Sequence, residues 1–194
     1  MYKLAILASG SGSNAENIIR YFQQHEDINV SLVLANKPDA FVLQRAKDLG
    51  VPARIFDKAT FSSTDFSKQL VSEGITHLVF AGFLWLAPSH LIAAFPNRIV
   101  NIHPALLPKF GGKGMYGHAV HQAVVDAHEK ESGITIHLVN EEYDKGKPLF
   151  QASCVLDTND TADTVAQKIH QLEYEHFPRV IENWIHNKEI EEVM

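Results

Sequence analysis

The stretch Leu4-Ala5-Ile6-Leu7-Ala8-Ser9-Gly10-Ser11-Gly12-Ser13-Asn14 decides the fold. Its apolar run is short and ends in a glycine-rich turn, which is typical of a strand buried on both faces. Asn14 can then cap a helix in which Ile18, Ile19 and Phe22 fall on one side. A strand, a glycine turn and an amphipathic helix in this order predict the first half of a βαβ unit in a parallel sheet.

The same alternation continues along the chain. Further strands are predicted at 30–34, 53–56, 77–81, 98–103, 134–139 and 149–155, and further helices at 40–49, 66–73, 88–95, 118–128 and 161–185. We therefore expect one three-layer α/β domain over residues 1–194, with a Rossmann-like, mostly parallel sheet of about seven strands and helices on both faces. Ligands of such folds bind at the carboxyl ends of the strands.

Composition excludes several classes of protein. With 45% hydrophobic and 21% charged residues the chain is globular, and its formal charge of -6 leaves no strongly positive surface for a nucleic acid. A single cysteine, Cys154, excludes an intrachain disulfide and a multi-cysteine metal site. No run approaches the ~18 apolar residues of a membrane span, and the apolar start is too short for a signal peptide. We expect a cytoplasmic protein without a membrane partner.

The glycine loop after the first strand is suited to an anion. Glycines let the backbone approach a phosphate, and the first amides of the following helix point at it. The pattern Gly10-x-Gly12-x-x-Ala15 also fits a relaxed dinucleotide loop, but Asn36 stands where an acid should bind a ribose. A phosphate monoester therefore fits better than a dinucleotide. The alternative is a turn that only reverses the chain.

Two polar residues end the strand at 98–103. Asn101 and His103 are two residues apart, so they point to the same face of an extended segment. An amide donor beside an imidazole suits stabilisation of an oxyanion and transfer of a proton. Asp144 lies in an acidic turn after the next strand and could complete this site. A structural histidine and a solvated carboxylate are the alternatives.

Three other histidines have simpler interpretations. His118 and His121 share one face of a helix, as zinc ligands can, but no matching acid or cysteine pattern accompanies them. We expect them to support the loop or to contact a substrate, and we expect no metal site. His137 alternates with Thr135 on a strand and is expected to orient a neighbouring group.

Several separated motifs carry a family resemblance. They are Gly12-Ser13-Asn14, Asn36-Lys37, Ala81-Gly82-Phe83, Asn101-Ile102-His103-Pro104-Ala105-Leu106-Leu107-Pro108-Lys109, Gly133-Ile134-Thr135-Ile136-His137, and Asp144-x-Gly146 leading to Gln151. Together they resemble the 10-formyltetrahydrofolate-dependent formyltransferases over nearly the whole chain. The branch that they resemble most formylates phosphoribosylglycinamide (GAR) in purine biosynthesis.

The resemblance implies roles for individual residues. The catalytic residues would be Asn101, His103 and Asp144; GAR would contact Gly12, Ser13, Asn14, His170 and Glu173; and 10-formyltetrahydrofolate would contact Leu84, Trp85, Leu86, Ala87, Asn101, Asn140, Glu141, Glu142, Tyr143 and Asp144. The N-terminal half would thus bind the phosphate of GAR, and the C-terminal half would carry catalysis and folate binding. The partners would be small molecules, and the protein would be a monomer or homodimer.

The implied reaction predicts a charge state for the site. Attack of an amine on a formyl group creates one negative oxygen, which Asn101 and a cationic His103 could stabilise. The carboxylate of Asp144 would hold the pKa of His103 above ~6.5.

Two alternatives remain open. One is another enzyme that uses formyltetrahydrofolate, namely a hydrolase or a transferase acting on a different amine. A tRNA-formylating relative should add a basic C-terminal domain and a hydrolase an N-terminal domain, and we expect neither here. The other alternative is a non-catalytic nucleotide-binding module with a Rossmann-like fold.

Overall fold

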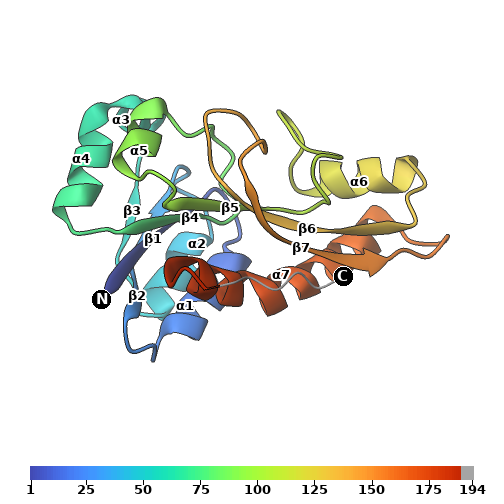
Figure 1. The fold of residues 1–194 in the computed structure, drawn as a ribbon, viewed down its shortest axis with the longest axis horizontal. Helices are drawn as coiled ribbons and strands as arrows, with labels where there is room; N and C mark the ends of the chain where they lie inside the picture. Colours follow the sequence, from blue (N-terminus) through green and yellow to red (C-terminus); the bar gives the residue numbers. More distant parts are fainter. Residues whose placement is uncertain (189–194) are drawn as a thin grey trace. The chain divides into compact units, whose positions relative to one another are not determined.

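The computed structural model describes residues 1–188, and the chain divides into two compact units at residues 101 and 102. The first unit contains β1 (Tyr2–Ala8), α1 (Ser13–Phe22), β2 (Ile28–Ala35), α2 (Val42–Asp48), β3 (Ala53–Ile55), α3 (Lys58–Ser62), α4 (Thr64–Ser72), β4 (His77–Phe80) and α5 (Ser89–Ala94). Strand β5 (Ile99–His103) runs from the first unit into the second, which continues with α6 (His118–Asp126), β6 (Glu131–Leu138), β7 (Pro148–Val155) and α7 (Ala162–Ile185) (Figure 1).

Within the described residues the strands form one seven-stranded sheet in the order β3-β2-β1-β4-β5-β6-β7. The pairs β1–β2, β1–β4, β2–β3 and β4–β5 are parallel, and only β6–β7 is antiparallel among the pairings described for these residues. The predicted α/β class with a mostly parallel sheet of about seven strands is confirmed. That residues 1–194 act as one domain stays a prediction, and each unit is described by itself below.

Strand β1 is the centre of the first unit. Residues 4–8 are fully buried between β2 and β4, as a strand covered on both faces requires. The chain moves outward from β1 through β2 to β3, and then returns to place β4 on the other side of β1. Right-handed crossovers put α1 and α2 on one face and α4 and α5 on the other. The loop after β1 therefore lies at the topological switch point, where α/β folds bind ligands.

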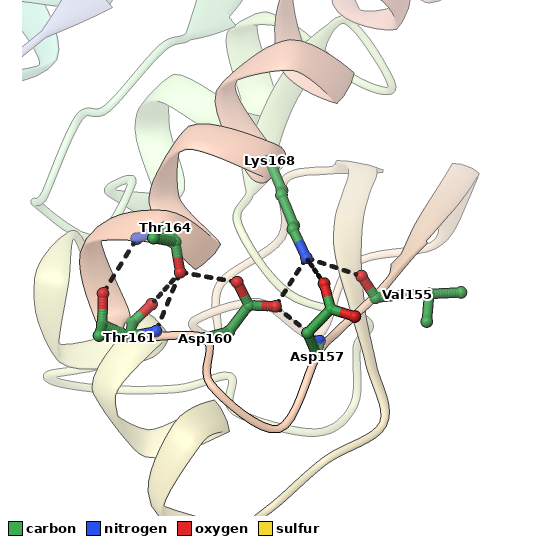
Figure 2. Close-up of polar contacts among 6 residues, drawn as sticks. All are labelled: Val155, Asp157, Asp160, Thr161, Thr164 and Lys168. Carbon is green, nitrogen blue, oxygen red and sulfur yellow. Dashed lines mark hydrogen bonds and ion pairs between the residues drawn. The ribbon is translucent and has the colours of Figure 1, made fainter.

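Polar contacts hold the start of α7 in the second unit (Figure 2). Thr161 caps the helix, since its hydroxyl accepts a hydrogen bond from the Thr164 amide. The Thr161 amide in turn donates to the Thr164 hydroxyl, which completes a capping box. Lys168 donates to Asp160 at 2.6 Å and to Asp157 at 3.1 Å. Lys168 and Thr164 lower the pKa of Asp160 to about 2. The connection between β7 and α7 is thereby fixed.

Candidate functional site

The side chain of His103 ends strand β5 and is 3% exposed. Its Nε2 lies 2.8 Å from the carbonyl oxygen of Phe110. Because a carbonyl oxygen only accepts hydrogen bonds, this contact places a proton on Nε2. Asn101 precedes His103 by two residues in the same strand and is partly buried. Residues two apart in a strand point to the same side of the sheet, so Asn101 and His103 share one face of β5.

Asp144 lies in the turn between β6 and β7, next to His103. Its Oδ2 accepts a hydrogen bond of 2.9 Å from the Gly112 amide and lies 3.5 Å from Nδ1 of His103. Its Oδ1 lies 3.6 Å from Nε2 of His137. The carboxylate is thus held between two buried imidazoles and one backbone amide. The predicted pair of His103 and Asp144 comes together within the second unit.

The backbone around Asp144 is unusual. Asp144 and Phe110 both adopt left-handed conformations, with φ of 55° and 56°. Such conformations are costly for Phe and tolerated by Asp, and they concentrate at functional sites. Gly146 closes the turn, because a Cβ there would lie 1.6 Å from the Leu138 carbonyl oxygen. The backbone of this turn therefore sets the direction of the Asp144 carboxylate.

His137 resembles His103 in its surroundings. It is 2% exposed, and its Nδ1 lies 2.8 Å from the carbonyl oxygen of Leu138, which fixes a proton there. Its other nitrogen faces Asp144. From the alternation of residues along the strand, we expect His137 to orient a neighbouring group. His137 contacts Asp144, so the Asp144 carboxylate is the group that it can orient.

The charge state of His103 differs from the expectation. Burial lowers the pKa of His103, and this effect outweighs the Asp144 charge and the Phe110 carbonyl, which raise it. The prediction of a pKa above ~6.5 is therefore wrong, because the imidazole is too deeply buried to hold a charge at rest. Burial would raise the pKa of Asp144, but His137, His103 and the Gly112 amide together hold it below its ordinary value.

A hydrogen-bond network fixes the segment that follows His103. Thr135 Oγ1 donates to the Ala105 carbonyl oxygen at 2.7 Å and accepts from the Leu107 amide at 2.9 Å. Gln151 donates to Thr135 and to the Leu107 carbonyl oxygen. Strands β6 and β7 thereby hold the backbone that leads from His103 to Phe110. Gln151 ended the sequence motif, and this network gives it a physical role.

The glycine loop of the first unit has the geometry expected of an anion site. Gly12 is the N-cap residue of α1, with φ 73°, and as a glycine it has no side chain to cap the helix. The Val42 amide donates to the Gly10 carbonyl oxygen, and Arg45 donates to the Ser11 carbonyl oxygen at 2.9 Å. Residues of α2 therefore fix the loop, and the N-cap position itself offers no side chain to the first amides of α1.

The two predicted folate-binding segments belong to different units. In the first unit, Leu84, Trp85 and Leu86 are partly buried and Ala87 is buried, and the Trp85 ring contacts Phe56, Phe61 and Phe83. In the second unit, Asn140 and Tyr143 are partly buried, Glu141 and Glu142 are exposed, and Asn140 Oδ1 accepts from the Glu142 amide.

The two residues of α7 predicted to bind GAR, His170 and Glu173, contact each other. His170 Nδ1 lies 2.9 Å from Oε2 of Glu173, whose carboxylate is buried, and this contact raises the pKa of His170. The other predicted GAR-binding residues, Gly12, Ser13 and Asn14, belong to the first unit.

No group of three or more His, Cys, Asp or Glu side chains in residues 1–188 could hold a metal ion. None of the helices in that range has both the length and the apolar character needed to cross a membrane.

Comparison with known proteins identifies the family. The chain is 39% identical over 192 residues to "Phosphoribosylglycinamide formyltransferase, chloroplastic" of Arabidopsis thaliana, covering 92% of this chain but 64% of that protein, so it spans just under two thirds of this relative's length. It is 34% identical over 187 residues to "Phosphoribosylglycinamide formyltransferase" of Bacillus subtilis (strain 168), covering 93% of each. The crystal structure of glycinamide ribonucleotide transformylase 1 from Symbiobacterium toebii matches with a TM-score of 0.87 and 29% identity, covering 96% of this chain and 89% of that one. The Formyl transferase family model matches residues 2–181, and the chain therefore belongs to the formyl transferase family.

Proposed function

We propose that the chain transfers the formyl group of 10-formyltetrahydrofolate to the glycyl amine of GAR, which yields formyl-GAR and tetrahydrofolate in purine biosynthesis. Family membership and the names of the relatives support this reaction. The observation that carries it is the buried contact between His103 and Asp144, beside Asn101 on the same strand. Such a set can stabilise a tetrahedral oxyanion and move a proton.

The reaction needs one new bond, one broken bond and one proton transfer. The amine nitrogen of GAR attacks the formyl carbon, and the carbonyl electron pair moves onto oxygen. Asn101 then donates a neutral hydrogen bond to this oxyanion. Collapse of the intermediate breaks the bond to N10 of the folate, and the proton lost by the amine goes to that nitrogen. Two bound substrates held in this geometry gain a large orientation advantage.

His103 has a resting state that suits proton transfer. Its neutral ring carries the proton on Nε2, and Nδ1 faces the Asp144 carboxylate. In a cationic ring the second proton would lie on Nδ1, against the Asp144 carboxylate, which stabilises that charge. We infer that Nε2–H exchanges its bond with the Phe110 carbonyl oxygen for a bond to the reacting groups. His137 keeps the Asp144 carboxylate in place during this exchange.

The residues proposed to bind the two substrates come from both units. Gly12, Ser13 and Asn14 bind the phosphate of GAR, because the first amides of α1 complement a dianion. His170 and Glu173 bind its ribose and glycinamide part. Leu84, Trp85, Leu86, Ala87 and residues 140–144 contribute to folate binding, with the apolar side chains of the first segment against the heterocycle. We further predict a cytoplasmic monomer or homodimer, which fractionation and light scattering measure.

The test is turnover with a panel of acceptors. Purified protein is mixed with 10-formyltetrahydrofolate, and the absorbance change on deformylation is followed with GAR, with another amine or with water as acceptor. We expect turnover with GAR only, and none in His103→Ala. Equal deformylation without GAR would identify a hydrolase. Binding of nucleotide without any turnover would favour the non-catalytic module.

A further inference from the structure

His121 is a buried histidine that the fold itself leaves unsatisfied. It lies on α6 and is 4% exposed, and within residues 1–188 neither ring nitrogen has a hydrogen-bond partner. Of the two, Nδ1 is completely sealed from solvent. His103 and His137 are buried to the same degree, but each bonds a backbone carbonyl. A buried polar atom without a partner is costly, so a use outside the fold must explain it.

The surroundings of His121 indicate where that use lies. Helix α6 packs against α7 within the second unit. His121 is close enough to interact electrostatically with His170 and Glu173 of α7, and also with His118 and His103. Glu173 is 5% exposed and bonds His170. His121 therefore lies within electrostatic range of a buried carboxylate and of the catalytic imidazole.

The state of the His121 ring limits the chemistry that it can offer. Burial lowers the pKa of His121, and the charge of His170 acts in the same direction. A cation would also need a proton on the sealed Nδ1, where no acceptor lies. The ring is therefore neutral, with its proton on Nε2, because an unpaired buried N–H is less tolerable than an unpaired acceptor. Such a ring donates one hydrogen bond to a neutral oxygen.

A sugar hydroxyl matches both neighbours. It accepts a hydrogen bond from an imidazole N–H and at the same time donates one to a carboxylate such as that of Glu173. A phosphate only accepts at neutral pH, and an ammonium group only donates, so neither satisfies the two side chains together.

We propose that His121 donates a hydrogen bond from Nε2 to a ribose hydroxyl of GAR that also bonds Glu173, so that His121 is a further binding residue for the sugar. This assignment rests on the proposed function. It accounts for the Nε2 donor, which has no partner within residues 1–188 in the free protein and gains one when substrate is bound, while Nδ1 stays an unpaired acceptor.

The test compares His121→Phe with wild type, using GAR and its analogue that lacks the ribose hydroxyls. His121→Phe removes the donor and keeps the ring, and His121→Met replaces it if phenylalanine prevents folding. We expect the KM for GAR to rise about 10-fold or more, the value for one buried hydrogen bond whose partner is left unpaired. The KM for the folate should stay within about twofold, and the melting temperature should be unchanged or higher. With the analogue, variant and wild type should bind equally.

The control is His176→Phe, which replaces a buried ring of α7 that lies against Phe150. It should not change the KM for GAR. If His121→Phe leaves the KM for GAR within twofold of wild type, or weakens GAR and the analogue equally, His121 only fills space and the inference is overturned. Wild-type protein without GAR turnover would instead overturn the proposed function.

Discussion

Nδ1 of His103 lies 3.5 Å from Oδ2 of Asp144, and the other nitrogen of His103 is committed to the Phe110 carbonyl oxygen. The distance exceeds that of a charge-assisted hydrogen bond, which is 2.7–2.9 Å in proteins. A neutral imidazole beside an ionised carboxylate explains this separation. The contact would shorten when Nδ1 takes a proton, so the pair is arranged to stabilise a charge that exists only during the reaction.

Replacing Asp144 with Asn tests this relationship. The amide keeps the shape of the side chain but removes the charge that stabilises protonated His103. We expect kcat to fall at least about 100-fold, as for loss of acid–base assistance. The pKa of the His103 ring, followed by NMR titration, should fall further, because Asp144 is a cause that raises it. Asp160→Asn is the matched control, since it removes a carboxylate at the start of α7 and should leave kcat unchanged. A wild-type rate and an unmoved titration in Asp144→Asn would mean that Asp144 only supports the fold of the turn.

Replacing His137 with Phe should change the pH dependence of the rate. His137 helps to hold the pKa of Asp144 below its ordinary value, so its loss should raise that pKa. Asp144 would then be protonated at higher pH, and the acid limb of the pH–rate profile should move upward. We expect kcat to fall about 10-fold, less than for loss of a reacting group, with the KM values little changed. An acid limb that stays in place would show that His137 only fills the core.

The limits of sequence reasoning are visible at particular elements. Strand β1 and the glycine loop were predictable because an unbroken apolar run beside glycines has few other interpretations. The helix predicted at 161–185 is α7, with Thr161 as its cap. Helix α3 was missed, because its five residues are too few for a helical period to appear. Its start depends on Asp57, which caps it through the Thr60 amide.

The candidate site was only partly predictable. The joint direction of Asn101 and His103 follows from strand geometry, but the pairing with Asp144 came from the family resemblance. The left-handed conformation of Phe110 has no signal in a residue of that type, and that of Asp144 has only a weak one, because Asp is enriched in such conformations without being specific to them. The pKa of His103 was predicted in the wrong direction because the depth of burial depends on packing, which a single sequence does not reveal.

Replacing Gly12 with Ala tests the phosphate loop. A Cβ at Gly12 would lie 2.4 Å from the Cβ of Val42, and the φ of 73° also disfavours alanine. The loop must shift away from α2, so we expect the KM for GAR to rise at least about 10-fold, the loss of a charge-assisted hydrogen bond or more, while the folate KM changes less than threefold.

Gly50→Ala is the matched control for Gly12→Ala. Its φ is 71°, but no atom lies within 4 Å of the added Cβ, so it brings the conformational cost without the clash. It should lower stability by about 1 kcal/mol and leave both KM values unchanged. Equal increases of the two KM values in Gly12→Ala would contradict the assignment of the loop to phosphate.

Stability should fall in acid because His77 is buried without charge. Burial and the nearby Arg98 lower the pKa of His77 to about 4. In the unfolded chain the pKa is near 6.5. As the pH falls below ~6.5, the unfolded state binds a proton that the folded state refuses, so the free energy of unfolding decreases until about pH 4 and then levels off. Since one pKa unit corresponds to ~1.4 kcal/mol, His77 alone accounts for about 3 kcal/mol over this range, as an order of magnitude.

Urea unfolding of wild type and His77→Phe between pH 7.5 and 4 measures the effect. The variant should lose about 3 kcal/mol less than wild type, while replacing the exposed His128 with Asn, which tolerates its left-handed backbone, should leave the pH dependence as it is. Parallel curves for wild type and His77→Phe would mean that His77 does not contribute to acid lability, and that other buried histidines such as His103 account for it.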